Sequence, residues 1–336
     1  MFPSLNTVQH SAGQVVFGHY EIVSLLGVGS CGYVYLAKHK GLSDFLVALK
    51  IFYPGVENKI DIKRLKAEIR ASYAVNHPNV IRCFEYVSGA NLAGFTMEYA
   101  AGGSLRKLMQ NGHVHDLNKI ASILSSACEG LSAVHEAGII HRDLKPENIL
   151  FSSSGSLKIA DFSVAVWQDP LREESGSPVG TVDYMSPEYL TSGKIDQRSD
   201  IYAVGAIIYQ ILTGDIPCQG ANPYHTLRLR MESEPTPLFY YRPDCPLQLE
   251  DIVTKALERD PNNRYQNVKE MLVDVNEFKN IITRKTFVKK IQDYPKEETP
   301  ENTVLPENTK AGVFGYLALS SIIALSVILI GLICSF

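Results

Sequence analysis

The sequence lacks closely spaced cysteines. Its 336 residues include six cysteines, and no two of them form a C-x-x-C pair. The pattern therefore matches neither a zinc site nor the disulfide framework of a small secreted domain. We expect all six to be free thiols in a reducing compartment: Cys31, Cys83, Cys128, Cys218, Cys245 and Cys334.

The chain also lacks a concentration of positive charge. Its formal net charge is -4 and no large basic block occurs, so nothing indicates a nucleic-acid partner. Residues 1–20 have neither a basic start nor a continuous apolar run, which excludes a typical secretory signal. No internal repeat stands out. Hydrophobic residues make up 45% of the chain and charged residues 20%, as in an ordinary globular protein of about two domains.

The final segment contains no charged residue at all. From Ala311 to Phe336 the sequence is almost entirely apolar. A helix that spans a bilayer needs roughly 20 apolar residues. The alternatives are a buried core helix, which is rarely this long or this uniformly apolar, and a tail buried in an oligomer interface. We therefore expect residues 311–336 to form one C-terminal transmembrane helix in contact with the lipid bilayer.

Residues 283–310, just before this segment, are polar. Pro295, Pro300 and Pro306 stand among several glutamates. Proline and charge together disfavour a packed core. We expect a flexible linker here.

Between these ends, the hydrophobic pattern divides the chain into two parts. Alternating, strand-like stretches occur at residues 20–23, 33–36 and 47–50, followed by a helix with one apolar face at residues 62–69. Helical spacing returns over residues 117–134, and residues 201–212 are apolar on nearly every side, as in a helix that is buried all round. The order predicts an α+β protein with a small β-rich lobe, a larger helical lobe and a cleft between them.

Glycines cluster between the first two predicted strands. Gly27, Gly29 and Gly32 are followed by Val34. Glycine lets backbone N–H groups approach phosphate oxygens without a clash from Cβ. The pattern alone is compatible with a dinucleotide-binding loop, a phosphate-binding loop of a kinase or a plain turn. The element that follows is a predicted strand, whereas a dinucleotide fold requires a helix.

Lys50 ends the third predicted strand and is a candidate phosphate ligand. Its ammonium group can reach the phosphates of a nucleotide if a carboxylate holds it, and Glu68 on the predicted helix faces the right way to do so. The alternative is a solvent-exposed lysine and glutamate, which is the usual fate of both residue types. Spacing alone does not decide between the two.

The strongest pattern consists of two runs: HRDLKPEN at residues 141–148 and DFS at residues 161–163. Phosphoryl transfer requires mainly positioning and charge neutralisation. Asp143 can accept the proton of an acceptor hydroxyl, and Lys145 can neutralise charge on the moving phosphoryl group. Asn148 and Asp161 offer the hard oxygen ligands that Mg²⁺ prefers.

In this order, the glycine-rich stretch, Lys50, Glu68, the HRDLKPEN and DFS runs and Ser186-Pro187-Glu188 resemble the eukaryotic-like (Hanks-type) serine/threonine protein kinases, in a bacterial style. The resemblance covers residues 20–282 and implies a bilobal kinase fold, with an N-lobe at about 20–99 and a C-lobe at about 100–282. It implies ATP and Mg²⁺ as cofactors, with Mn²⁺ as an alternative metal. The ATP-binding residues that it implies are Gly27, Gly29, Gly32, Val34, Ala48, Lys50, Glu68, Glu98 and Ala100, the last two in the hinge that follows the gatekeeper Met97.

The same resemblance assigns structural and regulatory roles. It implies that Glu188 pairs with Arg264 and that Asp200 braces the catalytic loop. It also implies that Thr181 bonds Asp143 and Lys145 in a structural role. An arginine beside the catalytic aspartate can pair with a phosphate on the activation segment. The regulatory candidates are therefore Arg142 and the phosphosites Ser175 and Ser177.

Lys145 and the GTVDY run at 180–184 resemble kinases that act on serine and threonine. The complete activation segment favours protein substrates over small molecules. A membrane-tethered pseudokinase scaffold and a small-molecule phosphotransferase are the alternatives. An active enzyme is favoured because no residue is missing from the set Lys50, Glu68, Asp143, Asn148 and Asp161.

One position departs from the family. Ser163 replaces the glycine of the usual DFG run, and that glycine tolerates backbone angles that serine resists. We expect some strain here in certain states of the loop.

The sequence thus predicts four parts: an N-terminal extension at 1–19, a kinase domain at 20–282, the linker at 283–310 and the anchor at 311–336. Because ATP is cytoplasmic, the kinase domain should lie in the cytoplasm. Lys310, just ahead of the apolar run, favours the same orientation. We expect a single-pass, tail-anchored membrane protein whose partners are protein substrates at or near the membrane.

Overall fold

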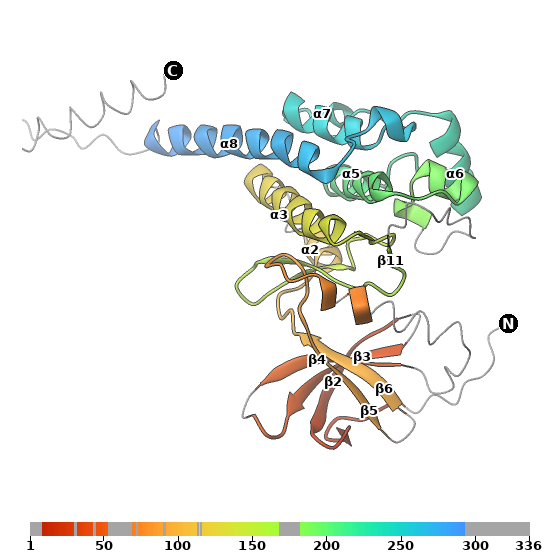
Figure 1. Ribbon diagram of the computed structural model, residues 1–336. Helices are drawn as coiled ribbons and strands as arrows, with labels where there is room; N and C mark the ends of the chain where they lie inside the picture. Colours follow the sequence, from red (N-terminus) through yellow and green to blue (C-terminus); the bar gives the residue numbers. More distant parts are fainter. Residues whose placement is uncertain are drawn as a thin grey trace, which may run out of the picture. The chain divides into compact units, whose positions relative to one another are not determined.

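A computed structural model describes residues 9–29, 32–42, 45–52, 69–71, 73–89, 92–112, 114, 116–167 and 182–292. The chain divides into two compact units, residues 1–288 and 289–336. The first unit contains the fold described below (Figure 1). Of the second unit, only residues 289–292 are described, and they end a helix.

The N-terminal part of the first unit is a six-stranded antiparallel sheet. Its strands are β1 (Val15–Val16), β2 (Tyr20–Val28), β3 (Gly32–His39), β4 (Leu46–Phe52), β5 (Cys83–Gly89) and β6 (Leu92–Glu98). Their order is β1-β2-β3-β4-β6-β5. The three strands predicted from alternating hydrophobicity are confirmed as parts of β2, β3 and β4. Strand β1 pairs with β2, so the sheet begins before the predicted domain boundary at residue 20.

The two faces of this sheet differ. On one face, Tyr35, Leu49 and Ile51 are almost fully buried and form a core cluster with Ile22 and Val87. Successive side chains in a strand point to opposite faces, so Val34, Ala48 and Lys50 lie on the other face. Register supports this placement, because Val34 is opposite Lys50 and Ala48 is opposite Met97.

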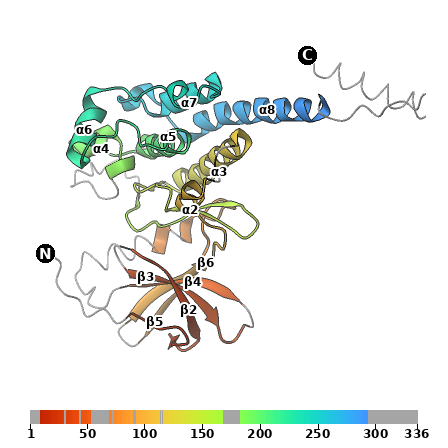
Figure 2. The same ribbon diagram turned by 180° about the vertical axis from the view of Figure 1, so that it is seen from behind.

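The C-terminal part is mainly helical. Its helices are α2 (Leu105–Gln110), α3 (Leu117–Glu136), α4 (Pro187–Ser192), α5 (Gln197–Thr213), α6 (Pro223–Glu232), α7 (Leu247–Ala256) and α8 (Val268–Gln292). Among its described residues are also two small sheets: β7 (Gly103–Ser104) with β9 (Ile149–Phe151) and β10 (Leu157–Ile159), and β8 (Ile139–Ile140) with β11 (Val166–Trp167). Both views separate the large sheet from the helices (Figures 1 and 2). The α+β, two-lobed prediction is confirmed.

Helix α5 is the centre of the helical part. Thirteen of its 17 residues are buried, which confirms the helix predicted to be buried all round. Asp196 caps its start, and Gly214 ends it in a left-handed conformation with φ of 88°. A Cβ on Gly205 would lie 2.9 Å from the Cβ of Ala256, so glycine lets α5 pack closely against α7. This packing fixes the position of Asp200, near the start of α5.

The predicted linker begins too early. Helix α8 continues to Gln292, so residues 283–292 belong to this helix rather than to a flexible segment. The physical reason is composition: lysine, arginine and glutamine favour helix, and the first proline of the region is Pro295.

Other predictions fall on residues that the structure does not describe. The predicted membrane segment at 311–336 and most of the predicted helix at 62–69 lie outside the described residues. Residues 69–71 and 73–74 are helical. Among the described residues, no helix has both the length and the apolar character needed to cross a membrane.

Candidate active site

The glycine-rich stretch joins β2 to β3. Gly27 lies opposite Val34 in the ladder, and the N–H of Gly29 donates to the carbonyl of Gly32 at 2.8 Å. A Cβ on Gly32 would lie 2.1 Å from the carbonyl oxygen of Ile51. Gly32 is therefore required by the close approach of β3 to β4, whatever the stretch binds. The strand that follows the glycines is confirmed, which removes the dinucleotide alternative.

Lys50 connects the two lobes. The residue is only 5% exposed, and its Nζ lies 3.1 Å from Oδ1 of Asp161, in a segment far along the chain. The alternative of a solvent-exposed lysine is therefore wrong. Glu68, its predicted partner, lies outside the described residues.

The carboxyl group of Asp161 is held ionised. Burial raises its pKa, but the charge of Lys50 and hydrogen bonds from Lys50 and Ser163 bring the pKa below the ordinary value of 3.8. An ionised carboxylate next to a buried ammonium suits a site that binds metal and phosphate.

The catalytic loop lies between β8 and β9 and gathers three predicted site residues. Nζ of Lys145 donates to Oδ2 of Asp143 at 2.6 Å. Nδ2 of Asn148 donates to the backbone carbonyl of Asp143 at 2.8 Å and contacts its Oδ2 at 3.3 Å. Asp143 is 8% exposed, so its orientation is set by these neighbours.

Asp200, in α5, braces this loop, as the resemblance implied. Its two carboxylate oxygens accept from the backbone N–H groups of His141 and Arg142, each at 2.9 Å. Nε2 of His135 lies 2.8 Å from the same carboxylate. Burial raises the pKa of Asp200, but the hydrogen bond and charge of His135 and the contacts with His141 bring it below its ordinary value.

These bonds hold a strained backbone. Arg142 has φ of 68°, in the left-handed region that a residue with a side chain rarely adopts. Such a conformation costs about 1–3 kcal/mol and persists only where its surroundings enforce it. The buried carboxylate of Asp200 supplies that enforcement at the residue before Asp143.

The DFS segment contacts the catalytic loop directly. The ring of His141 lies 5.0 Å from that of Phe162, and its Nε2 is 3.1 Å from the carbonyl of Ala160. The strained residue here is Asp161, with φ of 67°, whereas Ser163 has no positive φ. The strain expected at Ser163 is therefore absent in this state of the loop.

Of the predicted hinge residues, Glu98 ends β6 and Ala100 lies just after the strand. The N–H of Glu98 donates to the carbonyl of Arg82 at 2.9 Å, and its carboxylate pairs with Lys158 at 2.8 Å. The carbonyl of Ala100 accepts from the N–H of Gly103 at 3.3 Å. Val34, Ala48 and Lys50 lie on one face of the six-stranded sheet to which β6 also belongs, and Glu98 is opposite Val47 in that sheet.

The predicted pair between Glu188 and Arg264 is present. Two parallel hydrogen bonds of 2.9 and 2.7 Å join the guanidinium to the carboxylate. The hydroxyl of Ser199 adds a third at 2.8 Å. Burial raises the pKa of Glu188, but the hydrogen bonds and charge of Arg264 bring it below the ordinary value of 4.5.

Arg230 was missed by the sequence analysis. This arginine of α6 is 2% exposed and donates to the backbone carbonyls of Val182, Asp183 and Met185. It thereby fixes the short turn η1 (Val182–Tyr184), which follows Thr181. Its signal in the sequence was weak, because an arginine in a polar helix usually faces solvent. His135 was missed for a similar reason, because a polar residue near the end of an amphipathic helix usually faces solvent.

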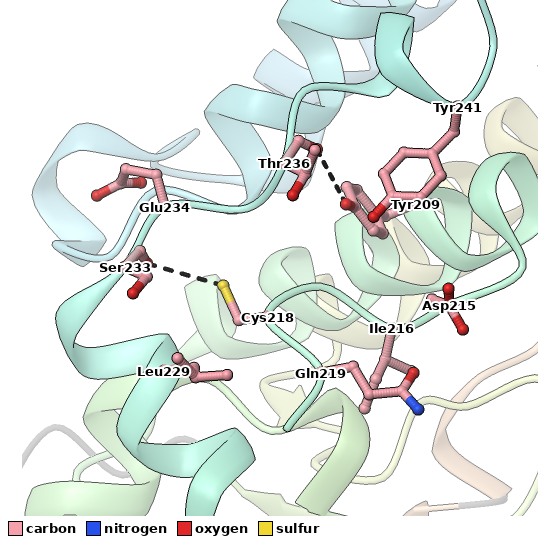
Figure 3. A pocket seen from close by; sticks show the side chains of 10 residues that line it. All are labelled: Tyr209, Asp215, Ile216, Cys218, Gln219, Leu229, Ser233, Glu234, Thr236 and Tyr241. Atoms are coloured by element: carbon pink, nitrogen blue, oxygen red, sulfur yellow. Dashed lines mark hydrogen bonds between the residues drawn. The ribbon is translucent and has the colours of Figure 1, made fainter. Parts of the chain in front are cut away.

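Ser175, Ser177 and Thr181 lie outside the described residues. A cavity of about 450 Å³ exists elsewhere, next to α6, and is lined by Tyr209, Cys218 and Tyr241 among others (Figure 3). None of its lining residues belongs to the predicted site.

The residues at the site fit a hard cation. Because Nδ2 of Asn148 donates to Asp143, the amide oxygen of Asn148 remains as a ligand, and Asp161 supplies an ionised carboxylate. Within the described part of the chain, no group of three or more His, Cys, Asp or Glu residues could hold a metal. A cation here would therefore depend on substrate phosphate oxygens as well, which is the usual manner of Mg²⁺.

Comparison with known proteins agrees with this geometry. A sequence model of the protein kinase domain matches residues 20–275. The chain is 32% identical to a probable serine/threonine-protein kinase PknB of Lactococcus lactis over 304 residues, which cover 89% of this chain and 48% of that protein. It is 31% identical to the serine/threonine-protein kinase PknB of Mycobacterium leprae, over 76% of this chain and 42% of that one.

A third relative is the serine/threonine-protein kinase PrkC of Bacillus subtilis, 30% identical over 78% of this chain and 41% of that protein. The chain thus spans less than half the length of these curated relatives.

Proposed function

The chain belongs to the protein kinase domain family, and on that premise we propose that it transfers the γ-phosphate of ATP to serine and threonine hydroxyls of proteins. One observation carries the proposal most directly. Lys50 of the sheet meets Asp161 at 3.1 Å, beside a loop in which Lys145 and Asn148 both contact Asp143. Phosphate-binding, metal-binding and proton-accepting groups thus converge from both lobes.

Each group has a defined task. Asp143 orients the acceptor hydroxyl and accepts its proton as the oxygen attacks phosphorus. Lys145, already 2.6 Å from Asp143, neutralises charge that develops on the transferred group. Lys50 holds the non-transferred phosphates. Asn148 and Asp161 would hold Mg²⁺, which supplies charge neutralisation when bound.

Selection of serine and threonine rests on Lys145 and on the relatives, whose names describe serine/threonine kinases. Lys145 occupies space beside Asp143, where a short acceptor side chain must approach. We propose that Thr181 completes this arrangement by bonding Asp143 and Lys145.

Loss of proton acceptance tests the catalytic assignment. Purified chain should transfer phosphate from Mg-ATP to a generic protein substrate, and Asp143→Asn should lower that rate by orders of magnitude while nucleotide binding persists. Lys50→Met should also abolish transfer. Nucleotide binding without transfer in the unaltered chain would favour the pseudokinase scaffold, and transfer to small molecules alone would favour a small-molecule phosphotransferase.

We propose that the enzyme phosphorylates its own activation segment at Ser175, Ser177 or both. Arg142 supports this, because its cationic side chain belongs to the catalytic loop and contacts the carbonyl of Val164 at the start of that segment. Mass spectrometry of the active chain should find phosphate between Asp161 and Thr181 that is absent from Asp143→Asn. An active preparation without phosphate in that range would exclude the idea.

We also propose that residues 311–336 anchor the enzyme in a membrane, with the kinase domain in the cytoplasm. The support is the uncharged apolar run and the 18 residues, 293–310, that separate it from the end of α8. A flexible coil of that length reaches about 20–25 Å, so substrates would be proteins at or near the bilayer. Full-length chain should resist carbonate extraction, and truncation after Thr309 should release it with an unchanged rate on a soluble substrate. Recovery of the full-length chain in the soluble fraction without detergent would contradict the anchor.

A further inference from the structure

One ion pair joins α2 to the catalytic loop and has no role in the proposed phosphoryl transfer. Nε of Arg106, in α2, donates to Oε1 of Glu147 at 2.7 Å. Glu147 stands between Pro146 and Asn148 in the HRDLKPEN run. The backbone N–H of Arg106 also donates to the carbonyl of Pro146 at 3.1 Å, so α2 is attached to the catalytic loop at two points.

Arg106 reaches a third element. Its Nη2 donates to the hydroxyl of Tyr184 at 2.6 Å, and that hydroxyl donates to Oε1 of Gln210 at 2.7 Å. Burial raises the pKa of Tyr184 to about 12, although the charge and hydrogen bond of Arg106 lower it, so the hydroxyl keeps its proton and serves as a donor. One guanidinium therefore joins the catalytic loop, turn η1 and α5.

The pair lies where a peptide substrate must approach. The neighbouring residue Asn148 contacts Asp143 directly, and Tyr184 ends turn η1, shortly before Glu188. Both side chains reach solvent, since Glu147 is 46% exposed and Arg106 is 27% exposed. Residues of the substrate that flank the phosphorylated hydroxyl would meet this surface.

We propose that Arg106 determines substrate specificity by neutralising Glu147, so that the peptide surface beside Asp143 does not select a basic side chain. The proposal rests on the proposed kinase function. Without Arg106, Glu147 would present an uncompensated, half-exposed carboxylate that attracts lysine or arginine. Without Glu147, Arg106 would present an uncompensated cation that attracts aspartate or glutamate.

The experiment compares four proteins: the unaltered chain, Arg106→Gln, Glu147→Gln and the double variant. Substrates are matched peptides that carry Arg, Gln or Glu in turn at each position flanking one serine. The quantity measured is the ratio of kcat/KM between the Arg and Glu peptides. Asp183, an exposed acid in η1, is the same in all four proteins and therefore shifts every ratio alike.

The two single variants should shift the ratio of kcat/KM in opposite directions. At one or more flanking positions, Arg106→Gln should favour the Arg peptide by about threefold to tenfold relative to the unaltered chain. Glu147→Gln should shift the ratio by a similar factor toward the Glu peptide, and the double variant should return close to the original ratio. Arg106→Lys keeps the charge and should retain the original ratio.

A purely structural role for Arg106 predicts something else. Loss of its bond to Tyr184 would lower kcat/KM for all peptides by one common factor, and the ratio would stay constant. A constant ratio at every position in Arg106→Gln would overturn the proposal.

A second readout separates this proposal from the kinase function itself. Binding of the same peptides with alanine in place of the serine requires no transfer. The charge preferences should appear there in the same order, even if the unaltered chain transfers no phosphate. Equal binding of Arg and Glu peptides to Arg106→Gln would overturn the specificity proposal alone.

Discussion

Replacement of Arg264 by methionine tests how the C-lobe holds the end of the activation segment. All five N–H donors of this guanidinium are used: Nε to Glu258, Nη1 to Glu188 and Arg198, and Nη2 to Glu188 and Arg259. The side chain of Arg264 is fully buried, and that of Glu188 is 18% exposed. Methionine fills similar volume but leaves the carboxylate without its cation.

The expected loss is large. Removal of one partner from a buried ion pair costs about 3–5 kcal/mol. For a folded unit of this size, each kcal/mol corresponds to roughly 2 °C, so Tm should fall by about 6–10 °C. Arg228→Met is the matched control, because Arg228 pairs with Glu232 at 2.9 Å on the surface of α6, with both side chains more than half exposed. An exposed pair contributes at most about 1 kcal/mol.

The pH dependence gives a second criterion. The pKa of Glu188 in the folded protein lies below its ordinary value of 4.5. The pair with Arg264 therefore stabilises the fold fully above about pH 4.5, and this contribution is lost as the pH falls through the folded-state pKa. In Arg264→Met the buried carboxylate lacks its cation and its pKa rises, so protonation relieves the cost. The Tm difference between the two proteins should therefore shrink from neutral pH toward about pH 5. Differential scanning calorimetry measures both effects, and an Arg264→Met loss no larger than that of Arg228→Met would refute the reasoning.

Three further predictions concern the site. Arg230→Met should raise the KM for a peptide substrate several-fold but not the KM for ATP, because Arg230 holds the carbonyls of η1; equal increases in both KM values in steady-state kinetics would contradict this. Asp200→Asn should lower kcat at least about tenfold with nucleotide affinity retained, since an amide cannot accept from both N–H groups of the strained loop; calorimetric ATP titration beside a transfer assay checks both. Ser163→Gly should not raise the transfer rate, because Ser163 has no positive φ and its hydroxyl supports ionised Asp161; a several-fold increase in the same assay would restore the strain that the sequence suggested.

Local pattern predicted the elements well where one physical signal dominated. Strands β2, β3 and β4 alternate in hydrophobicity because one face of their sheet is buried, and α5 is apolar all round because helices and turns surround it. The catalytic loop was predictable for another reason. Asp143, Lys145 and Asn148 lie within one short loop, so residues that are close in the sequence are also close in the folded protein.

Contacts that join distant segments were not predictable in the same way. Lys50 and Asp161 are 111 residues apart, and only the packed fold shows that they meet. The hydrogen bonds of Arg230 to backbone carbonyls carry no sequence signal, since carbonyls belong to every residue. Strand β1 has only two residues, too few for a period to be recognised.

The predicted start of the linker at residue 283 was wrong, because it was inferred from polar composition alone. The polar, lysine-rich residues that follow Ile282 were taken to indicate a flexible segment, although such residues also favour helix. Helix α8 continues through them to Gln292. The first proline of the region, which would disfavour a helix, comes only at Pro295.

The most direct test of the central claim is the product of the reaction. Purified chain incubated with Mg-ATP and a protein that contains serine, threonine and tyrosine should yield phosphoserine or phosphothreonine, with one ADP released for each phosphate transferred. Asp143→Asn, with its fold and ATP binding retained, should yield neither. Phosphotyrosine as the sole product, or phosphate transfer at an undiminished rate by Asp143→Asn, would contradict the account.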